Sequence, residues 1–348
     1  MSIAAAKYVA RLVLAYALYY TGVLHGLKRR RLSGRAVVLM YHRVLTAAER
    51  ARSFSSDAIV VEPDTFARQL AWLQRHFVLL TPEQFAERLR EGRAFADASC
   101  LVTFDDGWAD NYANALPLLR RYDIPAIIFL PTRFVGAQHG FWQEQLARDL
   151  DGLRRAYRRD PAALAEAVAA HGLTDIVGDD GDDRRRIHDF VRALKRRPQA
   201  DVDRLRAAVA AILKAHSDDA HADHPDRFLD WDQIAAMAAA GIRFGSHAQS
   251  HRILPHLDDS EIDAELTESK REIETRLRRP VALFAFPNGD FDARSADAAR
   301  RAGYAAAFTT QPGTVGANDD PYRVRRINVH ERATRHLPLF YATLLGVL

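Results

Sequence analysis

Short hydrophobic runs alternate along much of the chain with longer stretches in which apolar residues recur at helical spacing. The runs that predict buried strands are 35–40, 77–80, 100–104, 126–130, 241–244, 281–286, 305–308 and 324–329. Two of the stretches that predict helices begin at Pro63 and at Thr81–Pro82. Three more cover about 111–122, 259–277 and 292–302. Strands and helices that alternate with short turns indicate a parallel α/β sheet or barrel.

This alternation is interrupted between Trp142 and about Phe228. The intervening sequence is rich in Ala, Arg and Asp, and it has helical patterns near 144–157, 161–171 and 186–215. It contains no convincing strand pattern. We therefore expect a helical insertion at about 143–228 within a domain that covers residues 32–348.

Residues 1–31 have a different pattern from the rest of the chain. Lys7 and Arg11 precede an uncharged run over 12–27, which ends at four basic residues, 28–31. The run is shorter than the roughly 20 residues that a spanning helix needs, and no small-residue cleavage site follows it. We expect an amphipathic helix at a membrane surface, with its tyrosines near the headgroups. A short membrane anchor and a helix docked on the domain's own surface are the alternatives.

The basic flank of this segment also bears on location. Positive residues beside an apolar run tend to stay on the cytoplasmic side of a membrane. We therefore expect a cytoplasmic protein, peripheral at the inner membrane surface, with a membrane-anchored protein as the alternative.

Composition excludes several classes of protein. Of the 348 residues, 48% are hydrophobic and 27% are charged, which excludes a disordered or polytopic membrane protein. The 49 basic residues are interleaved with 45 acidic ones, so the net charge of +4 does not indicate a nucleic-acid partner. Cys100 is the single cysteine, which rules out an intrachain disulfide and a cysteine-rich zinc site.

Two adjacent carboxylates, Asp105 and Asp106, follow the predicted strand 100–104 in the sequence TFDDG. Sites in parallel α/β folds are built at this end of the strands. Two like charges side by side raise one pKa unless a cation stabilises them. The pair therefore points to a site, although an Asp that caps the following helix is the alternative.

The segment SHAQSH, which follows the strand 241–244, carries His247 and His251. Imidazoles four residues apart lie on one face if the segment is helical, which suits a shared metal ion. Together with a carboxylate from the Asp105–Asp106 pair, they supply the ligands of an open catalytic metal site.

A third segment, FAFPNG at 284–289, also follows a predicted strand. Its turn, which contains Asn288 and Gly289, can present backbone N–H groups at the strand end, as an oxyanion hole requires. An ordinary Pro-Gly turn is the alternative.

These three motifs, together with LMYHRV at 39–44, resemble the polysaccharide deacetylase family, the NodB-homology carbohydrate esterases. The resemblance covers roughly 35–142 and 228–330, in the same order along the chain. It implies an α/β fold in the form of a distorted (β/α) barrel. It also implies metal-dependent hydrolysis of an N-acetyl group, or less often an O-acetyl group, on a sugar.

The resemblance assigns roles to matching residues. Asp105 matches the catalytic base, and Asp106, His247 and His251 match the metal ligands. The ion is one divalent metal, most often Zn²⁺ in this family, with Co²⁺, Ni²⁺ or Mn²⁺ as alternatives. A backbone N–H of the turn at 287–289 would stabilise the oxyanion together with the metal.

The sequence departs from the family in two places. Ala285 occupies the position of an arginine that orients the base, and Arg326 is the candidate to supply that charge from another direction. The family's acid is a histidine in a Leu-x-His motif, and the nearest candidate here is His330, with a surface histidine as the alternative.

Three further residues are candidates for the substrate pocket. His42, at the end of the first strand, either lines the pocket or packs in the core. Trp142 and Trp231 are candidates for stacking on a sugar, with core packing as the alternative. The expected substrate is an acetylated polysaccharide. The alternatives are deacetylation or deformylation of a lipid-linked sugar at the membrane surface, or a catalytically silent glycan-binding relative.

Overall fold

The computed structural model describes residues 3–157, 160, 162–163, 166, 169, 183–194, 197–214 and 224–348. The chain forms two compact units. The first consists of Met1–Ala47, Asp57–Ala137 and Phe228–Leu348, and the second of Ala48–Ser56 and Gln138–Arg227.

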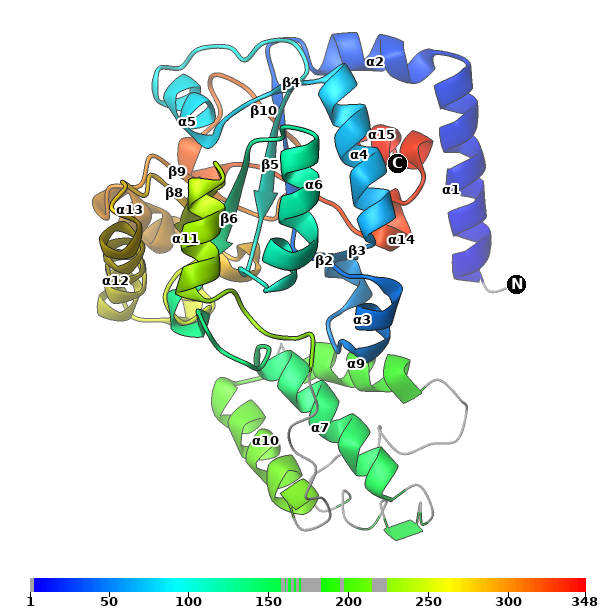
Figure 1. Cartoon of the computed structure of the whole chain (residues 1–348), viewed down its shortest axis with the longest axis vertical. Coiled ribbons are helices and arrows are strands. Elements are labelled where there is room, and N and C mark those ends of the chain that lie inside the picture. Colours follow the sequence, from blue (N-terminus) through cyan, green and yellow to red (C-terminus); the bar gives the residue numbers. More distant parts are fainter. Residues whose placement is uncertain are drawn as a thin grey trace. The chain divides into compact units, whose positions relative to one another are not determined.

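The first unit is built on a nine-stranded sheet in the order β10-β1-β5-β6-β7-β8-β9, with β4 paired to β5 and β11 paired to β1 (Figure 1). All these pairings are parallel except that of β10 with β1. The strands are β1 (Ala36–Tyr41), β4 (Val78–Leu79), β5 (Ser99–Phe104), β6 (Ala126–Leu130), β7 (Arg243–Ser246), β8 (Leu283–Ala285), β9 (Ala306–Phe308), β10 (Thr314–Val315) and β11 (Ile327–Asn328). A separate parallel pair consists of β2 (Arg43–Val44) and β3 (Val60–Val61).

The segment 324–328 joins the two ends of this sheet. Val324 forms a parallel bridge with Phe308 of β9, and Ile327 of β11 pairs with Leu39 of β1. The sheet is therefore curled, so that β1 and β9 are linked through this one short segment. This confirms the predicted α/β fold with a distorted barrel.

Helices follow most of these strands, and several begin as the sequence predicts. Thr81 caps α5 with a reciprocal capping box to Gln84, and Asp258 caps α12 in the same way with Glu261. The helices of the first unit are α4 (Pro63–His76), α5 (Pro82–Arg90), α6 (Leu116–Arg121), α11 (Trp231–Ala239), α12 (Asp259–Leu277), α13 (Ala293–Arg301), α14 (Glu331–Thr334) and α15 (Leu337–Leu344), besides the two N-terminal helices described below.

Two predicted helices are divided in the structure. The stretch 111–122 forms a π-helical segment, Asn111–Ala115, followed by α6, whose first turn contains Pro117. Proline has no N–H to continue the α-helical ladder, which explains the break. The stretch 186–215 is similarly divided into α9 (Asp183–Leu194) and α10 (Gln199–Lys214), which Pro198 separates. The predicted helix at 161–171 lies mostly outside the described residues.

The N-terminal segment forms two helices, α1 (Ile3–Tyr20) and α2 (Val23–Arg31), which meet at Gly22 with φ of 76°. One face of α1 packs against α15, where Ala15 is buried and the Tyr16 hydroxyl lies 3.4 Å from Nδ1 of His336. The segment is thus docked on the first unit. None of the helices in the described part of the chain combines the length and apolar character needed to cross a membrane.

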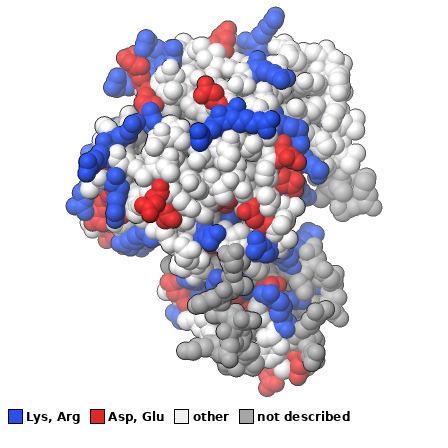
Figure 2. Space-filling view, in the orientation of Figure 1, with Lys and Arg blue, Asp and Glu red and all other residues white. Residues whose placement is uncertain are grey.

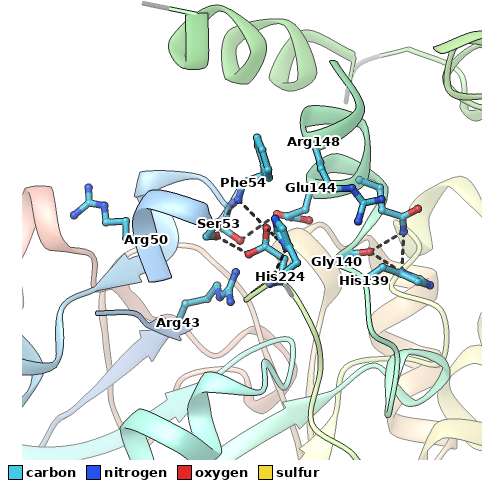
Figure 3. A network of polar contacts seen from close by, with 12 residues as sticks. Arg43, Arg50, Ser53, Phe54, His139, Gly140, Glu144, Arg148 and His224 are labelled. Carbon is cyan, nitrogen blue, oxygen red and sulfur yellow. Dashed lines mark hydrogen bonds and ion pairs between the residues drawn. The ribbon is translucent and has the colours of Figure 1, made fainter. Parts of the chain in front are cut away.

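The second unit contains α3 (Ala47–Arg52), α7 (Trp142–Ala156), α9 and α10. Its core consists of apolar residues from α7, α9 and α10, including Leu150, Ile187 and Val209. Asp226 holds the two ends of the unit together by accepting hydrogen bonds from the Ser53 hydroxyl at 2.5 Å and the Phe54 N–H at 2.7 Å (Figure 3).

Candidate active site

The carboxylates of Asp105 and Asp106 diverge at the end of β5. Asp106 has φ of 74° and Gly107 has φ of 67°, so the chain turns sharply between the strand and the next segment. A Cβ at Gly107 would lie 2.6 Å from Cδ2 of Leu130, which restricts this position to glycine. The turn directs each carboxylate to a different set of partners.

Asp105 forms a buried, two-pronged ion pair with Arg326. The two guanidinium nitrogens lie 2.6 Å and 2.7 Å from its two carboxylate oxygens. Arg326 is fully buried and Asp105 is 2% exposed. Burial raises the pKa of Asp105, but the charge of Arg326 and its hydrogen bonds, together with His247, bring that pKa below its ordinary value. Asp105 is therefore ionised at neutral pH.

Arg326 reaches Asp105 from the segment that closes the barrel. Its Nε donates to the carbonyl of Thr309 at 2.9 Å, which fixes the direction of the guanidinium. The structure thus brings Arg326 to the carboxylate that the sequence analysis paired it with, although the two residues are 221 positions apart.

Asp106, His247 and His251 form a cluster whose ligand atoms all lie within 4.8 Å of one another. Oδ1 of Asp106 is 3.5 Å from Nε2 of His247 and 3.3 Å from Nε2 of His251. Burial raises the pKa of Asp106, but the hydrogen bonds of both imidazoles hold it well below its usual range. These are the three residues predicted to hold a metal ion.

The spacing of the two histidines suggested that they share one face of a helix. In the structure they lie on a loop instead. His247 directly follows β7, and Ala248 and His251 have φ of 62° and 57°. This left-handed backbone brings the second imidazole back toward the first, so that the ring centroids are 4.9 Å apart. Nδ1 of His247 lies 2.7 Å from the carbonyl oxygen of Ala285, which leaves Nε2 to face Asp106.

Glu265 of α12 holds this loop in place. Its Oε2 accepts the N–H groups of Gln249 and Ser250, both at 2.8 Å, and its Oε1 accepts the Ser250 hydroxyl. Glu265 is 5% exposed. The sequence analysis missed it, although a glutamate on the apolar face of α12, beside Leu266, was a usable signal.

A second missed group lies behind Asp106. The indole N–H of Trp108 donates to Oδ2 of Asp106 at 3.0 Å, and the guanidinium of Arg43 lies 4.2 Å from the Trp108 ring centre. Arg43 is itself paired with Asp110 at 2.9 Å. A buried Trp N–H needs an acceptor, so the tryptophan that follows the Asp pair was the available signal.

His42 and His330 are the two other histidines that the sequence analysis named as candidates. His42 follows β1, and the charges that affect its pKa most are those of Asp106 and Asp105. The charges that affect the pKa of His330 most are those of Arg332 and Asp57. Burial lowers the pKa of both imidazoles. Within the described residues, Nδ1 of each is buried without a hydrogen-bond partner. The structure thus associates His42 with the carboxylates more closely than it does His330.

The remaining candidates differ in their surroundings. Asn288 has φ of 54°, and the N–H of Gly289 is already bonded to Phe286 at 2.8 Å, so the N–H of Asn288 is the donor left in this turn. Trp231 packs on the core of the first unit beneath Arg276, and Trp142 packs on the core of the second unit. No sugar-stacking surface is shown for either residue among the described parts of the chain.

The family described as polysaccharide deacetylase matches residues 92–174 and 179–307, and the chain belongs to this family. The relatives found are polysaccharide deacetylases, hydrolases that act on carbon–nitrogen bonds.

Particular relatives agree with this assignment. YxkH of Bacillus subtilis (strain 168), which is named after the family, is 20% identical over 84% of this chain and 70% of its own length. A poly-beta-1,6-N-acetyl-D-glucosamine N-deacetylase of Staphylococcus epidermidis is 31% identical over 29% of this chain and 38% of its own length. The chain thus matches little more than a third of that second relative.

Solved structures share the fold. The deacetylase PplD of Streptococcus pyogenes, in complex with acetate, has a TM-score of 0.56 at 18% identity and covers 86% of this chain and 95% of its own. IcaB from Ammonifex degensii has a TM-score of 0.54 at 18% identity, over 90% of this chain and 99% of its own.

Proposed function

We propose that this protein is a metal-dependent N-deacetylase of an N-acetylated polysaccharide. The observation that carries the proposal is the Asp106, His247 and His251 cluster beside an Asp105 that Arg326 keeps ionised. A metal site next to an unprotonated carboxylate is the arrangement that hydrolysis of an amide by an activated water requires.

The donor set of the cluster fits a divalent ion. Two imidazole nitrogens and one carboxylate oxygen are the ligands of open catalytic zinc sites, and they leave positions free for water and substrate. Of the ions considered, we favour Zn²⁺. A divalent ion held by these residues supplies Lewis-acid chemistry, because it polarises an acyl carbonyl and makes water more acidic.

The chain's own groups would perform the proton transfers. Asp105, held ionised and oriented by Arg326, accepts the proton of the attacking water. The N–H of Asn288 is available to the oxyanion. His42 or His330, in its protonated form, then donates a proton to the leaving amine. We favour His42, because the charges of Asp106 and Asp105 favour its protonated form.

The substrate class follows from the relatives. A polymer of N-acetylglucosamine is favoured by the named activity of the Staphylococcus epidermidis protein. A lipid-linked acetylated sugar is a second candidate, because the helix α1 exposes apolar side chains such as Val13, which is 63% exposed.

The test is acetate release from β-1,6-linked N-acetylglucosamine oligomers by the full chain, with metal content measured in parallel. We expect about one divalent ion per chain and measurable acetate release. His251→Ala should lose both the ion and the activity. Asp105→Asn should keep the ion but lower kcat by about 10²–10⁴-fold, because it removes the proton acceptor.

Wild-type protein that binds no divalent ion after incubation with zinc or cobalt would overturn the proposal. So would His251→Ala protein that retains full activity. Formate release from an N-formylated oligomer in place of acetate would change the acyl group assigned. Release only from a membrane-embedded lipid-linked sugar would favour the second substrate.

A further inference from the structure

Helix α1 has two apolar faces, of which one packs against α15. On the opposite face Val9, Val13, Leu14 and Tyr20 are 46%, 63%, 46% and 78% exposed. With the exposed Ala6, Ala10 and Ala17 between them, they cover an arc of roughly 140° around the helix axis. The surface over α1 is mostly uncharged in Figure 2. Several exposed apolar side chains on one face mark a binding surface, whereas a single one is ordinary.

The charged side chains of α1 and α2 are all basic. Lys7 and Arg11 are exposed and border the apolar arc on one side. Arg29 and Arg30 are exposed on α2, and residues 1–48 contain no acidic residue. Within the described part of the chain, Lys7 and Arg11 form no ion pair, so their charges are available to an external partner.

We propose that the outward face of α1 binds the surface of an anionic lipid membrane. Charge complementarity favours this occupant over a second copy of the chain. The helix α1 has no carboxylate, so two α1 helices packed face to face would form no ion pair to offset the charges of Lys7 and Arg11. A surface of phosphate and carboxylate headgroups over acyl chains matches both the cationic border and the apolar arc.

The helix would lie in the plane of the interface. It has 18 residues and is therefore about 27 Å long, slightly shorter than the roughly 30 Å hydrocarbon core of a bilayer. Its inner face is fixed to the first unit, since the Tyr19 ring lies 6.3 Å from that of Tyr341 on α15. Val9, Val13 and Leu14 would enter the acyl boundary, with Tyr20 near the headgroups.

The test is co-sedimentation of the full chain with vesicles of phosphatidylcholine, with and without phosphatidylserine, at two salt concentrations. We expect binding to the phosphatidylserine vesicles that weakens as salt rises. K7Q/R11Q should weaken binding roughly 30-fold, since each basic residue near an anionic surface contributes about fivefold. V9Q/V13Q should weaken it at least about tenfold, because it removes two apolar side chains from the buried face.

Matched controls are V78Q and R279Q. Val78 is 47% exposed on β4, and Arg279 is exposed after α12, so both are comparable in type but lie outside the proposed surface. These variants should bind the vesicles as the wild type does.

The proposal would be overturned if the wild type bound vesicles with and without phosphatidylserine equally, or bound neither. It would also be overturned if V78Q and R279Q reduced vesicle binding as much as the α1 variants. Self-association in the absence of lipid that V9Q/V13Q abolished, with no vesicle binding, would instead identify the face as a contact between copies. Acetate release from a soluble oligomer is a separate measurement, so failure of the deacetylase assay leaves this test unaffected.

Discussion

His42 and His330 are the two candidates for the proposed proton donor, and their surroundings differ. It follows β1 and experiences the charges of both Asp105 and Asp106, whereas His330 caps α14 and is affected first by Arg332. Both imidazoles have a lowered pKa because burial disfavours the charged form. The sequence analysis assigned the acid to His330, and the charges around His42 make it a second candidate.

This difference leads to a prediction for catalysis. His42→Asn should lower kcat for acetate release by about 10²–10⁴-fold without changing the metal content, because it removes the proton donor to the leaving amine. His330→Asn should have a smaller effect. The measurement is the pH profile of kcat for both variants. If His330→Asn lowered kcat this much and removed its fall at alkaline pH, while His42→Asn did neither, the donor would be His330.

At the scale of single elements, the loop after β7 depends on a carboxylate from another element. Glu265 of α12 binds two successive N–H groups of this loop, where Ala248 and His251 have left-handed backbone conformations. A non-glycine residue in this conformation costs free energy, which the surrounding contacts must offset. Glu265 therefore acts on the candidate metal site by positioning the loop that carries His251.

Glu265→Gln should weaken metal binding about 10–100-fold, the usual effect of changing a group that orients a ligand. The control is Glu268→Gln, since Glu268 on the same helix accepts from the side chain of Gln249, at 2.8 Å, and from no backbone N–H within the described residues. The measurement is competition for zinc with a chromophoric chelator. Equal losses in the two variants would show that α12 as a whole, and not the Glu265 contact, determines affinity.

The hydrophobic pattern predicted the order of the elements well and their interruptions less well. The strand Ala126–Leu130 and the helix Asp259–Leu277 have the predicted bounds, because an apolar run or an amphipathic stripe with a capping box defines each locally. The antiparallel β10 was missed because two residues, Thr314–Val315, carry no periodicity. The pairing of Asp105 with Arg326 was inferred only through a family resemblance, since no local pattern joins residues 221 positions apart.

For the molecule as a whole, the partly buried imidazole of His330 makes stability depend on pH. The pKa of His330 is lowered in the folded state by burial and by Arg332. As the pH falls through about 6.5, the unfolded chain takes up a proton at this histidine before the folded chain does. The contribution of His330 to the free energy of unfolding is therefore fully present above its unfolded-state pKa. It is lost as the pH falls from the unfolded-state pKa through the lower folded-state pKa.

His330→Asn should accordingly make the free energy of unfolding of the metal-free protein less dependent on pH between about pH 5 and 7.5. Urea titrations at several pH values measure this difference. His256→Asn, at an exposed position of the same unit, is the control and should leave the dependence unchanged. An unaltered slope for His330→Asn would contradict the assigned environment.

The segment that closes the barrel also sets a sequence of events during synthesis on the ribosome. Asp105 is translated early, but its counter-ion Arg326 belongs to the segment 324–328, which links β9 to β1. Until Arg326 has left the ribosome, Asp105 has no guanidinium partner to orient its carboxylate. Under the proposed function, a nascent chain that already contains Asp106, His247 and His251 but not Arg326 would lack an oriented base, so hydrolysis would begin only once this segment has closed the barrel.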